Sequence, residues 1–377
     1  MRVLLNAWFW SRPETGSGQY TRRLVEHLSA LEPGLDVTLI APGKGLGFQV
    51  SKFSGKETLK PETSNLTKLY FEQVAFPRAC RRLRADVAHV PYWAPPMAPS
   101  VPTVVTIHDI IPLVLREYRG GPLVRAYTAL VATAARSAAL ALTDSEASRR
   151  DILAHLDLPP ERVRVIYLAA DPRFRPDPGP DDAAVRARYG LPERYVLYLG
   201  GFDVRKNVAT ALATYRWAGP VIGEECPLIV AGRLPERDTP FAPDPRRQAR
   251  SLGLRPEWVR FIGWVAEEDK PALYRGAVAF LFPSRYEGFG LPPLEAMACG
   301  TPVVGSNAAS IPEVVGDAGV LVDPDDAEGM AGAVIQLAED PTFHAELRRR
   351  ALVQAARFSW ERTARATLEA YREVAET

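Results

Sequence analysis

The stretch SRYEGFGLPPLEAMACGTPVV, residues 284–304, joins a glycine turn to a helix start and then to an apolar strand. Pro292 and Pro293 suit the first positions of a helix, where a missing N–H group costs no hydrogen bond. We therefore expect a helix from about Leu291, with Glu295 in its first turn. Strand, turn and helix in this order are typical of α/β domains.

The same turn places two carboxylates beside a site that suits an anion. Gly288 and Gly290 let the backbone of residues 288–291 approach a phosphate, and a helix N-terminus favours negative charge. Glu287 and Glu295 would repel a bare phosphate, but carboxylates accept hydrogen bonds from hydroxyl groups. Glu295 also has a structural interpretation, because an acid in the first turn complements the helix dipole. A sugar diphosphate is the ligand that satisfies the whole stretch.

Length and composition indicate a globular protein of two domains. The 377 residues are too many for one ordinary core, and 47% apolar and 24% charged residues are usual values. The net charge of +1 argues against a protein built mainly to bind nucleic acid. Three widely spaced cysteines predict neither a disulfide framework nor a zinc site, and fit a cytoplasmic compartment. No apolar run reaches the ~18 residues of a membrane span.

Short apolar runs alternate with helical patterns along the chain, which predicts α/β domains with doubly wound parallel sheets. The predicted strands of the first half are residues 3–7, 37–40, 87–90, 103–107, 140–143 and 163–166. Those of the second half are residues 195–199, 228–231, 259–262, 278–282 and 303–305. Predicted helices include residues 18–31, residues 148–155 and a long last helix over about residues 360–377.

A proline- and aspartate-rich stretch, residues 169–185, cannot form a regular element and marks a boundary. We expect an N-terminal domain over residues 1–172, a linker over 173–190, a C-terminal domain over 191–357 and a last segment over 358–377. Ligands of parallel sheets bind at the carboxyl ends of the strands. The expected site is therefore a cleft between the two domains.

A second glycine turn follows the first predicted strand. Gly16 and Gly18 open the helix of GSGQYTRRL, which favours contact with a phosphate or sugar over a plain tight turn. A dinucleotide fingerprint would need a glycine in place of Thr21 and an acid in place of Ala41. An NAD-dependent oxidoreductase is the alternative from another enzyme class, and these two residues argue against it.

A third turn, LYLGGFDVRKNV, ends a strand at residues 200–201 and places Arg205 and Lys206 before a helix that opens near Asn207. The planar fork of arginine and the point charge of lysine together form a diphosphate clamp. A solvated basic loop is the structural alternative. A strand, two glycines and two cations in this order are more specific than a charge run, so we favour the clamp.

His108 and Asp109, in VVTIHDIIPL, leave the end of an apolar strand, where side chains reach the ligand edge of a parallel sheet. This position favours a functional role over a structural one. In LTDSEASRRDI, Asp144 or Ser145 is expected to cap the next helix.

These segments together resemble the retaining GT-B glycosyltransferases of family 4. YEGFGLPPLEAMACGTPVV matches the E-x7-E pattern of that family, and the resemblance extends in order from Gly16 to about Asp323. The other matching segments are GSGQYTRRL, HDIIPL, TDSEASRRDI, GGFDVRKNV, LIVAGR and RFIGWVAEEDKPALYRGA. The resemblance implies two Rossmann-like domains that face each other across a cleft, with the last helix crossing back to the N-terminal domain. It also implies that the N-terminal domain binds the acceptor and that the C-terminal domain binds the nucleotide-sugar donor.

The resemblance also implies roles for single residues. Glu287 would bind hydroxyls of the transferred sugar, Glu295 would bind the ribose, and His108 would contact the sugar near the reacting carbon. Arg205 and Lys206 would neutralise the diphosphate. The further donor contacts that it implies are Gly16, Gly18, Gly201, Arg233, Val265, Gly288, Phe289, Gly290 and Leu291.

The implied activity is that of a hexosyltransferase that uses a nucleotide-sugar donor. GDP-mannose is the first expectation, because HDIIPL resembles bacterial mannosyltransferases of the family. UDP-glucose or another UDP-sugar is the alternative, and a non-catalytic nucleotide-sugar-binding protein is a third reading. No DxD triad stands in a suitable place, so we expect neither a metal nor a cofactor, and electrostatic stabilisation by Arg205 and Lys206 instead.

The acceptor is expected to be a saccharide or a lipid-linked saccharide. Residues 67–90 place arginines from Arg78 to Arg84 beside apolar side chains. One interpretation is a basic amphipathic segment that contacts the inner face of a membrane from the cytoplasm. The other is an ordinary covering helix whose arginines face water, and the sequence leaves both open.

Overall fold

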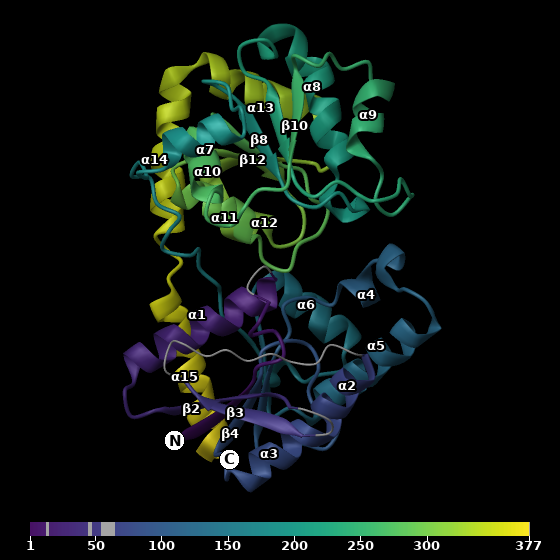
Figure 1. Ribbon diagram of the computed structural model, residues 1–377, viewed down its shortest axis with the longest axis vertical. Coiled ribbons are helices and arrows are strands. Elements are labelled where there is room, and N and C mark those ends of the chain that lie inside the picture. Colours follow the sequence, from purple (N-terminus) through teal and green to yellow (C-terminus); the bar gives the residue numbers. More distant parts are fainter. Residues whose placement is uncertain (13–14, 44–46, 54–64, 377) are drawn as a thin grey trace. The chain divides into compact units, whose positions relative to one another are not determined.

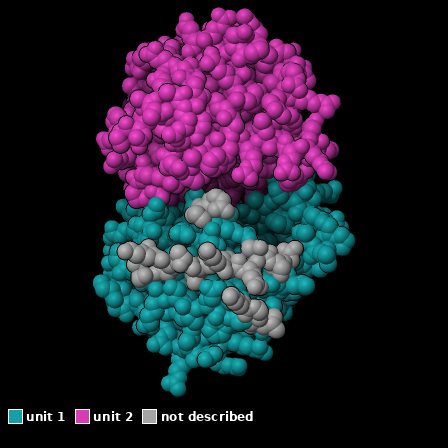
Figure 2. Space-filling view, in the orientation of Figure 1, with its two compact units in different colours: residues 1–168, 359–377 teal, residues 169–358 magenta. Residues whose placement is uncertain are grey.

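The computed structural model describes residues 1–12, 15–43, 47–53 and 65–376, and the chain forms two compact units. Unit 1 comprises residues 1–168 and 359–377, and unit 2 comprises residues 169–358. Figure 2 shows the units in different colours. Each is an α/β unit built on one sheet, so the predicted fold class of two doubly wound α/β domains is confirmed.

Unit 1 contains a seven-stranded sheet of order β3-β2-β1-β4-β5-β6-β7. All neighbours pair in parallel except β2 and β3, which are antiparallel. The strands are β1 (Arg2–Asn6), β2 (Asp36–Pro42), β3 (Phe48–Lys52), β4 (Val87–Val90), β5 (Thr103–Thr106), β6 (Leu140–Thr143) and β7 (Val163–Val165). Consecutive residues of β1 belong to different cores, Leu4 to one and Leu5 to another, so both faces of the sheet are covered.

Unit 2 contains a six-stranded, wholly parallel sheet of order β10-β9-β8-β11-β12-β13. The strands are β8 (Val196–Leu199), β9 (Leu228–Ala231), β10 (Val259–Gly263), β11 (Ala279–Phe282), β12 (Val303–Ser306) and β13 (Gly319–Val322). Helices α8 (Val208–Ile222) and α13 (Ala327–Glu339) pack against each other over the core of this unit. The strand order reverses between β8 and β11, which makes that boundary the topological switch point of the sheet.

The remaining helices connect the strands and can be followed by their labels in Figure 1. In unit 1 they are α1 (Gly16–Leu31), α2 (Asn65–Tyr70), α3 (Phe76–Arg82), α4 (Ile111–Val114), α5 (Pro122–Ala134), α6 (Glu146–His155) and α15 (Trp360–Glu376), and a π-helical turn (Phe71–Ala75) joins α2 to α3. In unit 2 they are α7 (Asp182–Arg188), α9 (Pro245–Ser251), α10 (Lys270–Gly276), α11 (Leu291–Ala298), α12 (Ile311–Val315) and α14 (Pro341–Ala355). Short 3-10 turns are Arg116–Tyr118, Ala135–Ser137, Pro160–Arg162, Val204–Lys206 and Gly316–Ala318.

The last helix, α15, packs on α1 within unit 1 although more than 300 residues separate them. Its Tyr371 hydroxyl lies 2.6 Å from Nδ1 of the fully buried His89, whose Nε2 lies 2.8 Å from the Thr106 hydroxyl. Tyr20 on α1 shares the same Thr106 hydroxyl at 3.0 Å. Burial lowers the pKa of His89 to about 3, so this histidine is a neutral bridge between the helix and the sheet.

All eleven predicted strands exist, with ends that differ by no more than two residues. Strands β3 and β13 and helix α7 were not predicted. Helix α7 lies inside the stretch predicted as a linker, residues 173–190, and this stretch belongs to unit 2. Buried Val185 and the contact of Asp182 with Arg275 hold it there. Thr377 lies outside the described residues.

The basic segment, residues 67–84, contributes its apolar side chains to the core of unit 1. Phe71 and Phe76 are fully buried, whereas Arg78 and Arg81 are exposed. This geometry is that of a covering helix, and contact of the arginines with a membrane stays a prediction. Within the described residues, no helix has the length and apolar character needed to cross a membrane.

Candidate active site

The predicted clamp and the predicted glutamate turn meet at the switch point of unit 2. Arg205 and Lys206 follow the carboxyl end of β8, and Glu287 follows the carboxyl end of β11. Because β8 and β11 are neighbours in the sheet, segments about 80 residues apart in sequence share one edge. Open parallel sheets bind ligands at this edge and at this boundary.

Three side chains converge on the Glu287 carboxylate. Arg205 Nη1 lies 2.6 Å from Oε2, Lys206 Nζ lies 2.7 Å from Oε1, and the Ser284 hydroxyl donates to Oε1 at 2.6 Å. Arg205 Nη1 also donates to the Tyr286 carbonyl oxygen at 2.9 Å. All three charged side chains are at least 85% buried. The cations therefore hold the carboxylate in a fixed position within a largely buried site.

Burial alone would raise the pKa of Glu287, but Lys206 and Arg205, together with hydrogen bonds from Lys206 and Ser284, hold it below its usual value. Glu287 is therefore ionised at neutral pH. An ionised carboxylate offers about four lone-pair sites, and contacts with the described residues occupy three, so one of the four is left by these residues for a hydroxyl. Lys206 uses one of its three N–H donors on Glu287 among the described residues, which leaves donors for an anion.

Ser310 holds the turn between β11 and α11 through two hydrogen bonds to its backbone. Its hydroxyl lies 2.9 Å from the Glu287 carbonyl oxygen and 2.7 Å from the Phe289 carbonyl oxygen. Phe289 is buried, and its ring packs edge-on against Phe358 at 5.8 Å. Gly290 caps α11 with a φ of 115°, a left-handed conformation that favours glycine. Helix α11 begins at Leu291 as predicted.

Glu295 is the fifth residue of α11, so the prediction that it lies in the first turn is wrong. It is buried and accepts a hydrogen bond from Tyr274 Oη at 3.2 Å. Burial raises its pKa to about 7, with Glu267 adding to the rise and Lys270 opposing it. Because the effect of the helix dipole is confined to the first turn, it does not explain Glu295, whose structural contact is instead the hydrogen bond that joins α11 to Tyr274 of α10.

The other predicted donor contacts of unit 2 lie at the same edge of the sheet. Gly201 follows β8, Arg233 follows β9 and is exposed, and Val265 follows β10 and is buried. The three strand ends are linked through the backbone, because Gly200 donates to Ala231 at 3.1 Å and Gly232 donates to Gly263 at 2.8 Å. Their contact with a nucleotide stays a prediction.

In unit 1, Gly16 is exposed at the start of α1. Gly18 is buried, and a Cβ atom there would lie 2.0 Å from the Arg12 carbonyl oxygen. Close packing of α1 on the preceding loop therefore explains the glycine at position 18 without a ligand. Contact of either glycine with a phosphate stays a prediction.

His108 pairs with Asp144 rather than with its sequence neighbour Asp109. Its Nδ1 lies 2.6 Å from Asp144 Oδ2, and the two residues follow the adjacent strands β5 and β6. Burial would lower the pKa of His108, but the Asp144 charge and hydrogen bond outweigh it and raise the pKa. Asp109 accepts a hydrogen bond from the Ile111 N–H group instead. The ring of Tyr20 lies edge-on to the imidazole at 4.9 Å.

The predicted helix cap is Ser145, which accepts a hydrogen bond from the Ser148 N–H group at 3.0 Å. Asp144 is the functional candidate that sequence reasoning assigned to capping alone. The available signal was its position, because an acid that ends the strand next to the His108 strand must lie beside that histidine. Tyr20 carried no such signal, since its place depends on how α1 packs.

No group of three or more His, Cys, Asp or Glu side chains in the described part of the chain is arranged to hold a metal ion. The three cysteines are free and buried.

We predict that Asp144→Asn lowers the pKa of His108, because the substitution removes the negative charge that favours the imidazolium. The measurement is an NMR titration of the imidazole C–H resonances, with the His108 signal assigned from its loss in His108→Gln. His27, His155 and His344 are internal controls. An unchanged His108 titration would show that Asp144 does not set this pKa.

We predict that Glu295 makes the ligand-free protein less stable as pH rises. The folded state holds the Glu295 proton up to about pH 7, whereas the unfolded state releases it near pH 4.5, so the free energy of unfolding falls between these values. The difference in pKa corresponds to a loss on the order of 3 kcal/mol. Chemical denaturation from pH 5 to 8 should show a smaller decline for Glu295→Gln, and parallel curves for both proteins would contradict the assignment.

The chain matches two family descriptions, Glycosyltransferase Family 4 over residues 15–174 and Glycosyl transferases group 1 over residues 193–340. It is similar to the O-antigen chain mannosyltransferase B of Escherichia coli, with 32% identity over 375 residues and 96% of each chain covered.

Among solved structures, sucrose-phosphate synthase from Thermosynechococcus elongatus superposes with a TM-score of 0.73 at 23% identity over 99% of both chains. WaaG, a glycosyltransferase involved in lipopolysaccharide biosynthesis, superposes with a TM-score of 0.71 at 16% identity over 98% of this chain and 99% of that one. These likenesses establish the GT-B fold. The relative covers nearly the whole chain, and each of the two family matches covers one of the two sheets. The chain therefore belongs to glycosyltransferase family 4 and is a glycosyltransferase.

Proposed function

We propose that this glycosyltransferase moves a mannosyl group from GDP-mannose to a saccharide or lipid-linked saccharide, with retention of configuration and without a metal ion. The observation that carries the proposal is the Glu287 carboxylate held between Arg205 and Lys206 at the switch point of unit 2. The similarity to a mannosyltransferase along nearly the whole chain supports mannose as the transferred sugar.

The site offers a positive group to the leaving diphosphate and a negative group to the sugar. In this proposal, Lys206 uses its remaining donors on the diphosphate while Arg205 and Ser284 keep Glu287 in place. Charge that develops on the leaving group is then stabilised by groups that are already oriented, so the chemical step needs little reorganisation. Glu287 accepts a sugar hydroxyl and serves as a positioning residue rather than a nucleophile.

The proposed reaction is a substitution on one face of the sugar. The bond between the anomeric carbon and the phosphate oxygen breaks, and the acceptor oxygen forms a bond to that carbon on the same face. The departing phosphate takes the acceptor proton, so neither Glu287 nor Glu295 has to act as the general base. His108, oriented by Asp144, contacts the transferred sugar in this scheme. Glu295 accepts hydrogen bonds from the ribose.

We predict that Glu287→Gln and Lys206→Ala each lower kcat by ~10²–10³-fold, the usual effect of removing one oriented electrostatic group from an active site. Transfer of labelled sugar is the measurement, and activity in EDTA should equal activity without it. Arg247→Gln is the matched control, because Arg247 forms an exposed ion pair with Asp238. A near wild-type rate in Glu287→Gln or Lys206→Ala would sink the site assignment. A loss of activity in EDTA that added Mg²⁺ restores would sink the metal-independent mechanism.

A thermal-shift panel of GDP, UDP, GDP-mannose and UDP-glucose tests the donor. A ligand present at 100 times its Kd adds about 2.7 kcal/mol to the free energy of unfolding, which raises Tm by several degrees. We expect GDP and GDP-mannose to raise Tm and the uridine compounds to leave it unchanged. The reverse pattern would replace GDP-mannose with a UDP-sugar.

A further inference from the structure

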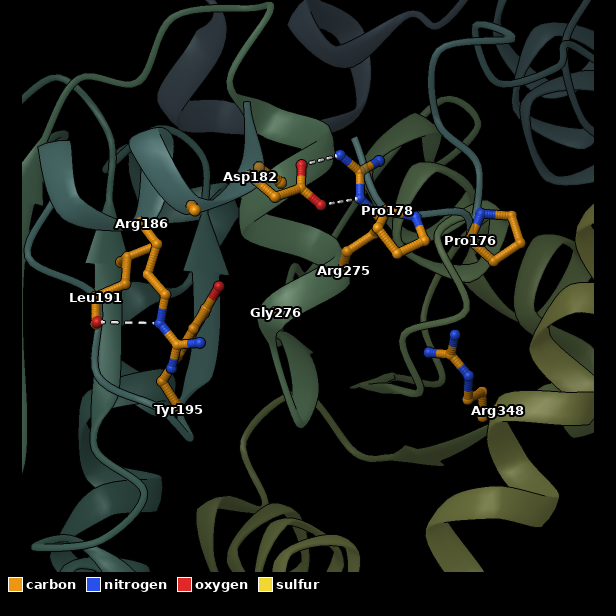
Figure 3. Close-up of a pocket in the computed structure, with 11 residues that line it drawn as sticks. Pro176, Pro178, Asp182, Arg186, Leu191, Tyr195, Arg275, Gly276 and Arg348 are labelled. Atoms are coloured by element: carbon orange, nitrogen blue, oxygen red, sulfur yellow. Dashed lines mark hydrogen bonds and ion pairs between the residues drawn. The ribbon is translucent and has the colours of Figure 1, made fainter. Parts of the chain in front are cut away.

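Unit 2 contains a cavity that is separate from the Glu287 site. Its volume is about 430 Å³, and it is lined by α7, α10, α14 and the segments that precede α7 and β8. Figure 3 shows the lining side chains. Tyr195 immediately precedes β8, and Gly276 lies three residues before β11, so the cavity is at the amino edge of the sheet. The Glu287 site follows the carboxyl ends of the same two strands.

The positive charge of one arginine at the cavity, Arg275, is compensated by an ion pair with Asp182. Arg275 Nε lies 2.8 Å from Asp182 Oδ2, and Arg275 Nη2 contacts the other carboxylate oxygen. The hydrogen bond from Arg275 is the main reason that the pKa of Asp182 is low, so the carboxylate is ionised. Asp182 is the only acidic residue among the lining residues, and this pair uses up its charge.

Two further arginines of the cavity keep their positive charge. Arg186 Nη2 donates to the Pro192 carbonyl oxygen at 2.6 Å, and Arg348 Nη1 donates to the Gly300 carbonyl oxygen at 3.0 Å. Neither arginine forms an ion pair with a carboxylate anywhere in the described part of the chain. Carbonyl groups orient a guanidinium group but do not cancel its charge. Each guanidinium group has five N–H donors, so most remain available.

The walls of the cavity combine these charges with apolar surface. In Figure 3, Arg186 and Arg348 lie on opposite sides of Gly276. Pro176, Leu191 and Ala272 contribute apolar lining. The volume lies in the range of small-molecule sites, which are mostly apolar with a few fixed polar groups.

We propose that this cavity binds a small phosphate-bearing molecule, a sugar phosphate or diphosphate ester, through Arg186 and Arg348. Guanidinium groups bind phosphate oxygens in a bidentate manner, and two of them match a ligand with two or more negative charges. The apolar lining suits the organic part of the ligand. The site does not depend on the proposed donor or mechanism.

Helix α10 lies between this cavity and the candidate active site. Its Arg275 and Gly276 line the cavity, while its Tyr274 donates a hydrogen bond to Glu295. A ligand in the cavity therefore contacts the same helix that holds Glu295.

The test uses inorganic pyrophosphate and isothermal titration calorimetry on the full chain. Lys206→Ala serves as the background, because it weakens pyrophosphate binding at the candidate active site. We expect the background protein to keep one pyrophosphate site. Adding Arg186→Gln and Arg348→Gln should weaken that site at least tenfold, and Arg186→Gln alone should weaken it several-fold. Adding Arg250→Gln, an exposed arginine of the same unit outside the cavity, should change it less than twofold.

Thermal melting of each variant separates a loss of binding from a loss of folding. If the double variant has a lowered Tm, the binding of pyrophosphate to Arg186→Gln alone tests the proposal. The proposal is overturned if the background protein binds no pyrophosphate or if binding survives the double substitution. It is also overturned if the protein sediments with phosphatidic acid vesicles through Arg186 and Arg348 but binds no pyrophosphate, since the anion is then a lipid headgroup. Failure of the candidate active site would appear separately, as equal pyrophosphate binding with and without Lys206→Ala.

Discussion

The ion-paired cluster of Glu287, Arg205 and Lys206 is the interaction on which the site of unit 2 depends. Two cations and a serine hydroxyl surround one buried carboxylate, and each of these groups would be costly to bury alone. The cluster exists because β8 and β11 are adjacent at the point where the strand order reverses. It fixes the loop after β8 to the loop after β11, and so it shapes the ligand edge of the sheet before any ligand arrives.

This arrangement alters the role that the sequence suggested for the two cations. The sequence predicted that Arg205 and Lys206 neutralise a diphosphate. In the ligand-free chain they compensate Glu287, and the pKa of that carboxyl group is low as a consequence. In the proposed function, a diphosphate would join a cluster that is already oriented, which would lower the reorganisation needed on binding. Glu295 is in the opposite situation, because burial raises its pKa to about 7 although Lys270 opposes the rise. One glutamate is charged in the free protein, and the other is close to half protonated at neutral pH.

Unit 1 uses neighbouring strands in a similar way. His108 after β5 meets Asp144 after β6, and the buried bridge from Tyr371 through His89 to Thr106 ties the last helix to the same sheet. Tyr20 contacts both groups of residues, since its hydroxyl reaches Thr106 and its ring faces His108. The orientation of His108 therefore depends on the packing of α1. Because Tyr20 and His89 share the Thr106 hydroxyl, it is also linked to the packing of α15 on the sheet.

Periodicity and turn residues were sufficient to predict most of the apolar strands. They were insufficient for β3, an antiparallel edge strand, for β13, a half-buried edge strand, and for α7, which contacts Arg275 about 90 residues away. The ordered motifs also singled out Arg205, Lys206 and Glu287, which the structure brings into contact. The same reasoning counted Glu295 into the first turn of α11, although the fifth residue of a helix lies beyond that turn. It also gave Asp144 a capping role alone and missed its contact with His108, because distance along the chain says little about distance in space.

The sequence by itself determined the α/β class and the positions of most strands and turns, since these follow from local patterns of apolar residues, glycines and prolines, and its ordered motifs carry the resemblance to glycosyltransferase family 4. Only the tertiary structure decided which charges meet. Ion pairs and shifts in pKa depend on burial and on which strands become neighbours, and the long-range pairing of β8 with β11 and of β5 with β6 sets both. The arginine-lined cavity at the amino edge also depends on the tertiary structure, because α7, α10 and α14 supply its charges from three distant parts of the chain.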